Sequence, residues 1–233
     1  MISNVYLSAR IVIQCKAVAM VKKSATGRRA AGDPQKIIDS ALALAGRMRW
    51  ADVGLAEIAA EAELTLGATL AHYRSKTAIL AAYMGQVDDQ VVAGISADIL
   101  DQAVRDRLFE TLMRRFDALA PHRNAIRSIL RSSGCDPLAA GCGALALLRS
   151  MGVMLECAGV GSHGFRGRIR AKGLAMIYLA TLRVWLRDDS EDMAATMAAL
   201  DRALDRADRL VGRLCRRARP RRAADDGGEG EGG

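Results

Sequence analysis

Few side chains in this sequence stand at spacings that support catalysis or metal binding. Its three histidines, His72, His122 and His163, are far apart, and no carboxylate pattern accompanies them. The five cysteines form no C-x-x-C pair, and no histidine follows them at zinc-site spacing. We therefore expect no metal site, no cofactor and no enzymatic activity. The cysteines are interpreted as buried or incidental thiols of a reducing cytosol: Cys15, Cys135, Cys142, Cys157 and Cys215.

Two short motifs resemble catalytic or nucleotide-binding signatures, but a structural role explains each better. The run from Gly159 to Gly164 spells G-x-G-x-x-G. That fingerprint needs a preceding strand in a βαβ unit, whereas a helical pattern precedes it here, so we predict a helix C-cap and a loop. Asp188 and Asp189 could form a carboxylate pair, yet their place beside Ser190 favours capping of a final helix.

The segment from Leu55 to Leu80 has the spacing of an element that reads nucleic acid. Its apolar positions predict a short helix to about Ala62, a break, and a second short helix that Thr65 caps and that ends near Tyr73. Ser75 is then expected to cap a longer helix. Two short helices joined by a tight turn form a helix-turn-helix, which binds double-stranded DNA through its second helix. The candidate DNA-binding residues are Thr65, Leu66, Thr69, His72, Tyr73 and Lys76, with Lys76 expected near the phosphate backbone.

Composition indicates which elements position these residues. Of the 233 residues 51% are hydrophobic and 26% charged, as in soluble globular proteins, and only 4% are aromatic. Helix formers dominate, while strand formers and prolines are scarce. These features disfavour a sandwich, a barrel or a doubly wound sheet. They predict an all-α protein of about nine helices, in which a three-helix helix-turn-helix domain precedes a C-terminal helical bundle.

Four segments are expected along the chain. Residues 1–33 form a flexible basic arm, 34–84 the helix-turn-helix domain, 85–211 a helical ligand-binding and dimerisation domain, and 212–233 a disordered tail. Residues 1–34 hold six basic side chains and one acidic one, so the basicity lies on the flanks and the body is almost neutral. The arm could lie in the minor groove. We also hypothesise that translation starts at Met20 rather than Met1.

The helix-turn-helix segment resembles the DNA-binding domain of TetR-family regulators over residues 35–84. The stretches IIDSALALA, LAEIAAEAEL and HYRSKTAIL carry the resemblance, and Tyr73, Ser75, Lys76 and Leu80 match the family's aromatic-x-Ser-Lys-x-x-x-Leu signature. The resemblance implies a cytoplasmic homodimeric regulator with a small apolar effector. It further implies that residues 168–187 and 191–211, in the last two helices, contribute to the dimer interface.

Three departures from the family pattern bear on DNA binding. Glu63 stands where the family usually has glycine in the turn, and Leu70 stands where it usually has a phosphate-contacting tyrosine. The candidate recognition helix carries no Arg, Lys, Asn or Gln, the side chains that usually contact base edges. The alternative is a helix-turn-helix that persists as a scaffold and no longer binds DNA.

The C-terminal third resembles a second group of proteins. Residues 181–207 are similar to the end of the ubiquinone-biosynthesis accessory proteins, which share the TetR fold but bind isoprenoid lipid instead of DNA. The resemblance lies in a helix that ends before Asp188, followed by Thr196 and by Leu200-Asp201-Arg202. Such proteins touch membranes through a later amphipathic helix. Here residues 213–222 are mostly arginine with little apolar face, so they imply at most weak contact with an anionic membrane.

A group of large apolar side chains on the C-terminal helices could line a pocket for a small apolar ligand. Ordinary core packing is the other explanation, because methionine fills irregular gaps. Similarly, the apolar stripe from Met193 to Leu214 could pack internally or form part of a dimer seam. The candidate pocket residues are Met113, Met151, Met154, Met176 and Trp185.

Overall fold

The computed structural model describes residues 33–96, 99, 101–133 and 137–218, and all regular elements in these ranges are helical. The prediction of an all-α protein of about nine helices is confirmed. Residues 1–32 of the predicted arm, and with them the Met20 hypothesis, lie outside the described residues, as do residues 219–233. Asp33, expected at the end of the arm, is instead the first residue of the first described helix. The elements are α2 (Asp33–Arg47), η1 (Trp50–Asp52), α3 (Leu55–Glu61), α4 (Leu66–His72), α5 (Lys76–Gly94), α6 (Val104–Leu119), η3 (Ala120–His122), α7 (Arg123–Ser133), α8 (Pro137–Cys157), α9 (Gly164–Trp185) and α10 (Ala194–Ala218).

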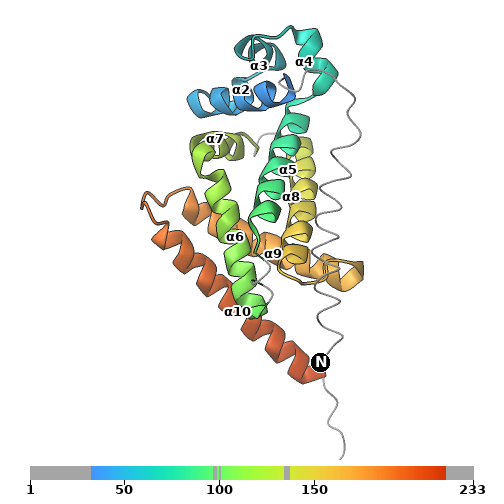
Figure 1. The fold of residues 1–233 in the computed structure, drawn as a ribbon, viewed down its shortest axis with the longest axis vertical. Coiled ribbons are helices and arrows are strands. Elements are labelled where there is room, and N and C mark those ends of the chain that lie inside the picture. The colour runs from blue at the N-terminus through green and yellow to red at the C-terminus, as the bar shows by residue number, and fades with distance from the viewer. Residues whose placement is uncertain (1–32, 97–98, 100, 134–136, 219–233) are drawn as a thin grey trace, which may run out of the picture.

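Helices α2, α3 and α4 gather at one end of the molecule, and α10 runs toward the other end (Figure 1). The apolar stripe of α2 drives this packing, since Ile37, Ile38 and Ala41 are almost fully buried. Ile58 and Ala59 of α3 lie in the same core. These buried apolar side chains therefore form the interior of the helix-turn-helix.

Capping residues begin the two helices that follow the turn. The Thr65 hydroxyl accepts from the Ala68 amide at 3.2 Å, and the Ser75 hydroxyl accepts from the Ala78 amide at 3.1 Å. Each bond satisfies an amide that the first helical turn leaves without a partner. The predicted caps of α4 and α5 are thus confirmed.

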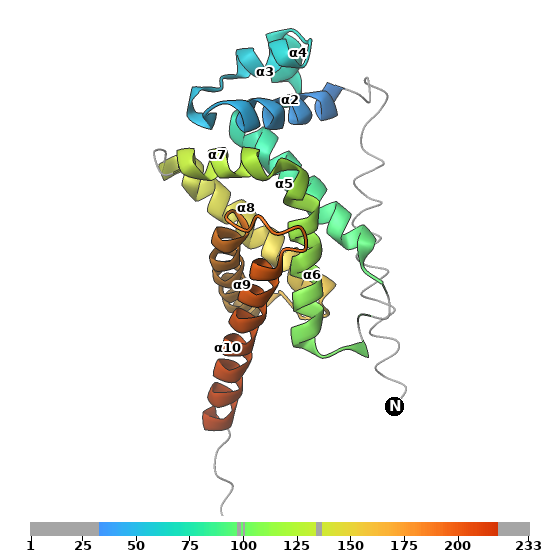
Figure 2. The same cartoon turned by 90° about the vertical axis from the view of Figure 1, so that its left-hand side faces the viewer.

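Helix α5 runs without interruption from Lys76 to Gly94, so the expected boundary at residue 84 falls within one helix. The helix-turn-helix also packs on the bundle, where α2 lies along α7 (Figure 2). Ser128 of α7 joins the two parts: its hydroxyl accepts from the Trp50 amide and donates to the Met48 carbonyl, each at 3.0 Å. These contacts make α5 and α7 the physical connection between the two regions.

Aromatic and methionine side chains form the interior of the bundle. The Phe116 ring stacks on Tyr178 at 5.3 Å between centroids and lies 5.8 Å from the Trp185 ring. Met151 and Met154 of α8 are fully buried. These side chains come from α6, α8 and α9, so their packing holds the three helices against one another.

The turn before α10 is built by Asp188, as the capping interpretation predicted. One carboxylate oxygen accepts from the Thr196 amide and hydroxyl at 2.7 and 2.6 Å, and the other accepts from Ser190. These hydrogen bonds hold the pKa of Asp188 down at about 2. Residues that carry the resemblance to the accessory proteins therefore stabilise the start of α10.

Two expectations about α10 need correction. Met193, predicted within the helix, precedes it and has a left-handed backbone with φ of 54°. The predicted disordered tail starts too early, because α10 continues to Ala218. Leu200 and Leu204 are buried, whereas Val211 is 56% exposed, so the stripe packs internally only along its first part.

The G-x-G-x-x-G segment is a helix C-cap and loop, as predicted. Gly159 has φ of 68° directly after α8, and the Val160 amide donates to the Leu155 carbonyl. This pattern satisfies the last carbonyls of a helix and suits glycine. In the described residues a helix precedes it and no strand is present, so it is not part of a dinucleotide-binding unit.

Candidate nucleic-acid interface and helical core

Helix α4 lies at the tip of the molecule and carries an exposed face (Figures 1 and 2). Leu66 and Leu70 are 44% and 38% exposed, and Thr65 and His72 are also exposed. Its main neighbours are α2 and α3, not the C-terminal helices. The structure therefore brings four of these side chains to one accessible element, short enough to enter a major groove.

Thr69 and Tyr73, which were predicted to contact DNA, are less exposed than such a contact requires. Thr69 is fully buried, and its hydroxyl donates to the Thr65 carbonyl at 3.3 Å. The prediction that Thr69 contacts DNA is wrong for this conformation, because its position on α4 faces the domain core. Tyr73 is half-buried, and burial raises the pKa of its hydroxyl.

The Lys76 side chain makes its hydrogen bonds within the helix-turn-helix domain. Its ammonium donates to the carbonyls of Trp50, at 2.9 Å, and Val53, and it lies 4.9 Å from the centroid of the Trp50 ring. Burial lowers the pKa of Lys76, while Asp52 and Glu57 raise it. An ammonium has three donors, so at most one remains for a phosphate oxygen.

Arg74 is the side chain at this end that sequence reasoning passed over. It is exposed, and it lies between the end of α4 and the start of α5. A guanidinium there can contact a phosphate beside the groove that α4 would enter. The available signal was its place inside the HYRSK stretch, between two positions of the family signature.

Glu63, in the turn between α3 and α4, has the backbone conformation for which the family pattern usually places glycine. Its φ is 57°, in the left-handed region, where glycine is unstrained and other residues are not. The Leu64 amide donates to the Ala59 carbonyl at 2.9 Å across it. This chain therefore adopts the turn of a helix-turn-helix despite an unfavourable residue.

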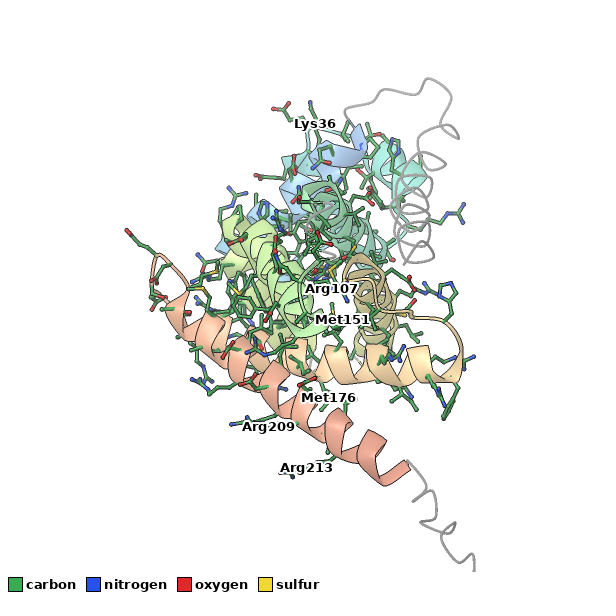
Figure 3. All side chains as sticks on the ribbon, turned by 60° about the horizontal axis from the view of Figure 1, so that its bottom comes forward. Lys36, Arg107, Met151, Met176, Arg209 and Arg213 are labelled. Atoms are coloured by element: carbon green, nitrogen blue, oxygen red, sulfur yellow. The ribbon has the colours of Figure 1, made fainter. Side chains whose placement is uncertain are left out.

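The candidate pocket residues do not form one group. Met151, Met154 and Trp185 are fully buried in the bundle, and Met113 packs at its margin. Met176 is 71% exposed on the outer side of α9, whereas Met151 lies within the bundle (Figure 3). The assignment of Met176 to an internal pocket is therefore wrong, because its position on α9 points away from the core.

A buried ion pair that sequence reasoning missed lies in this core. Arg115 of α6 is fully buried and pairs through Nη1 with Asp88 of α5, and the Ser150 hydroxyl donates to the same carboxylate at 2.7 Å. The Arg115 guanidinium also lies 5.4 Å from the Tyr178 ring centroid. A signal was present, since Arg115 falls on the apolar stripe of Leu108, Leu112 and Leu119.

Two adjacent hollows lie between the helix-turn-helix and the bundle. One, of about 230 Å³, is lined by residues that include Gln35, Tyr83 and Asp117. The other, of about 290 Å³, shares Leu42 and His122 with it. Burial raises the pKa of Tyr83 to about 12, with Tyr178 adding to the rise and Arg115 opposing it. Tyr83 thus lines the first hollow and also interacts electrostatically with Arg115.

Comparison with solved structures identifies the fold. A TetR transcriptional regulator from Nitrosomonas europaea is 27% identical, with a TM-score of 0.63 over 75% of this chain and 97% of that one. The chain has the TetR-family fold. A TetR regulator from a Rhodococcus species (20% identity, TM-score 0.54, 73% and 92% of the two chains) and one from Streptomyces coelicolor (18%, 0.52, 79% and 89%) agree.

A family model described as COQ9 matches residues 144–211, which cover most of α8, all of α9 and much of α10. The resemblance of the C-terminal region to the ubiquinone-associated proteins is thus confirmed. No curated protein sequence gives a significant match. In the described residues, no cluster of His, Cys, Asp and Glu could hold a metal ion.

Proposed function

We propose that this protein is a cytoplasmic, homodimeric DNA-binding transcriptional regulator controlled by a small ligand. The observation that carries the proposal is α4, which is accessible at the tip of a TetR-like fold and is not covered by the C-terminal helices. TetR-family solved neighbours support regulation as the general function.

Contacts on α4 would be largely apolar and hydroxyl-based. The exposed Leu66 and Leu70 can meet thymine methyl groups, while Thr65 and His72 can donate to bases or phosphates. Arg74 and the remaining donor of Lys76 would hold the backbone. Because matching half-sites lie about 34–36 Å or a multiple apart, a small change in the separation of two α4 helices would prevent simultaneous binding.

Dimerisation would use the exposed apolar side chains of α9, with α10 beside it. Phe165, Ile169 and Met176 are 77%, 55% and 71% exposed and recur on one side of α9. An apolar row of this kind is typical of an interaction surface. The proposed interface agrees with the expected use of residues 168–187 and 191–211.

The accessory-protein alternative has its own supporting observation. The COQ9 match covers seven of the twelve exposed large apolar side chains of the described residues. The α8 window Ala140–Cys157 is apolar and long enough to span a membrane, and 28% of it is buried. Length and composition alone are weak evidence of a span. This alternative predicts bound lipid and no operator.

A gel-shift assay with DNA from upstream of the protein's own gene tests the proposal. We expect a shifted band that resists nonspecific competitor, and we expect Leu66→Glu to abolish it, because the new carboxylate repels phosphate. Arg213→Ala is the matched control, since Arg213 is exposed on α10 at the opposite end (Figure 3). No shift, together with co-purified quinone-like lipid in mass spectrometry, would instead favour the alternative.

A further inference from the structure

Two donors of a buried guanidinium have no hydrogen-bond partner among the described residues. Arg115 bonds Asp88 through Nη1, while its Nε and Nη2 atoms are buried and have no acceptor at hydrogen-bond geometry. The Tyr178 hydroxyl is an electrostatic neighbour of the guanidinium, but it does not give these two atoms a partner. An unmade hydrogen bond in a protein interior is costly, and more so for a charged group. Buried donors without hydrogen bonds therefore need a specific explanation, and a ligand that supplies the acceptors is one.

The geometry of the guanidinium restricts what can fill these positions. The Nε–H and one Nη2–H point the same way and form one edge of the planar group. That edge matches the two oxygens of a carboxylate in a bidentate pair. A neutral carbonyl or hydroxyl would occupy one donor and leave the other without a partner.

The surroundings of Arg115 are apolar apart from a few donors. Phe116 and Tyr178 stack beside it, and Met151 and Met154 are fully buried in the same bundle. The Tyr83 hydroxyl, also buried without a partner among the described residues, is an electrostatic neighbour of Arg115. A carboxylate head with an apolar body suits this combination.

We propose that the Nε/Nη2 edge of Arg115 binds the carboxylate of an amphipathic acid whose apolar body packs among α5, α6, α8 and α9. The inference rests on the ligand control in the proposed function and specifies the class of ligand. Tyr83 lines the hollow beside α2, so the acid would enter from there.

Binding at Arg115 would act on α5. Asp88 belongs to α5 and already shares the guanidinium, so an incoming carboxylate repels it. Helix α5 starts directly after α4 and the Tyr73–Ser75 connection. Displacement of α5 would therefore move the DNA-reading end relative to the bundle.

Isothermal titration calorimetry of the full chain, without DNA, tests the proposal with sodium decanoate below its micellar concentration and with 1-decanol. We expect saturable decanoate binding, at least ten-fold weaker binding of decanol, and at least ten-fold weaker decanoate binding to Arg115→Met. Arg114→Met is the matched control, because the neighbouring Arg114 pairs with Glu110 at the surface, and it should bind as the parent does.

If Arg115→Met fails to fold because Asp88 loses its partner, the double variant Asp88→Leu/Arg115→Met replaces it. Apolar replacement of a buried ion pair is often neutral or stabilising. This variant should melt cooperatively yet lose decanoate binding. Equal affinity for decanol, unchanged binding in either Arg115 variant, or no decanoate binding would overturn the inference.

The gel shift distinguishes failure of this inference from failure of the proposed function. A gel shift that persists with no decanoate binding would leave the proposed regulator intact, whereas decanoate binding without any shift would remove the regulator alone.

Discussion

At the scale of single residues, the helix-turn-helix contains side chains that can contact a partner and side chains that hold the domain together. Arg74 and Lys76 are two positions apart, yet one is exposed and the other is bound to the carbonyls of η1 and of the chain after it. In the sequence both lie in the HYRSKTAIL stretch, and only Lys76 was expected near the phosphate backbone. Their different environments lead to opposite expectations for substitution.

Arg74→Ala should weaken DNA binding by a similar factor for every sequence and reduce the magnitude of the salt slope by about one, because one phosphate contact is lost. Its melting temperature should stay unchanged. Lys76→Met should instead lower the free energy of unfolding by about 1–3 kcal/mol, since two carbonyls lose a charged donor. Binding isotherms at several salt concentrations and thermal unfolding of both variants check this. A slope unchanged by Arg74→Ala would remove that residue from the phosphate contacts.

Glu63→Gly should stabilise the protein by about 1 kcal/mol, because it relieves a left-handed non-glycine residue. Chemical denaturation measures the change. Ala60→Gly is the matched control: Ala60 is exposed in α3, and glycine there should destabilise by a similar amount. Glu63→Ala should not stabilise, because it removes the charge and keeps the backbone strain. Stabilisation by Glu63→Ala equal to that by Glu63→Gly would assign the effect to charge instead.

At the scale of elements, the turn before α10 and the first half of this helix depend on a few polar contacts. Asp188 accepts hydrogen bonds from both Ser190 and Thr196 at the start of the helix. Arg105 of α6 reaches Asp201 and Asp205 of α10 at 2.5 and 2.6 Å. The cap sets where α10 begins, and the ion pairs hold its buried half against α6.

Asp188→Asn should destabilise the protein by about 1–2 kcal/mol at pH 7, because the neutral amide accepts fewer and weaker hydrogen bonds. The pKa of the folded-state carboxyl is about 2, below its ordinary 3.8, so its contribution is complete above that ordinary value. The contribution is lost as the pH falls from about 4 toward 2. Urea unfolding of both proteins from pH 7 to pH 2 should show the two free energies converging. A constant difference across that range would contradict the assigned pKa.

At the scale of the whole molecule, the exposed apolar row of α9 offers a surface for association with a second copy, and the position of α4 sets how the two copies of α4 would be presented. One chain presents one copy of α4 at its tip (Figure 1), whereas two chains joined through α9 and α10, as proposed, would present two. Because the row is solvent-exposed in a single chain, charge placed there should affect association and leave the fold intact.

Ile169→Glu and Met176→Glu should each shift the protein from dimer toward monomer, as measured by light scattering after size-exclusion chromatography. Their far-ultraviolet circular dichroism should match that of the parent, because both positions are exposed. Leu66→Glu, on the equally accessible α4, should stay dimeric. A parent that is monomeric at micromolar concentration would rule out this interface.

The sequence by itself determined the helical class, the helix-turn-helix, its caps at Thr65 and Ser75, and the turn at Glu63. These features depend on spacing and local backbone chemistry, which act over a few residues. Tertiary structure alone decided that Thr69 is buried, that Met176 is exposed, that Lys76 binds η1 and the chain that follows it, and that Arg115 meets Asp88 in the core. Which side of a helix faces the interior depends on how distant helices pack, and partners 27 positions apart along the chain meet only once that packing is made.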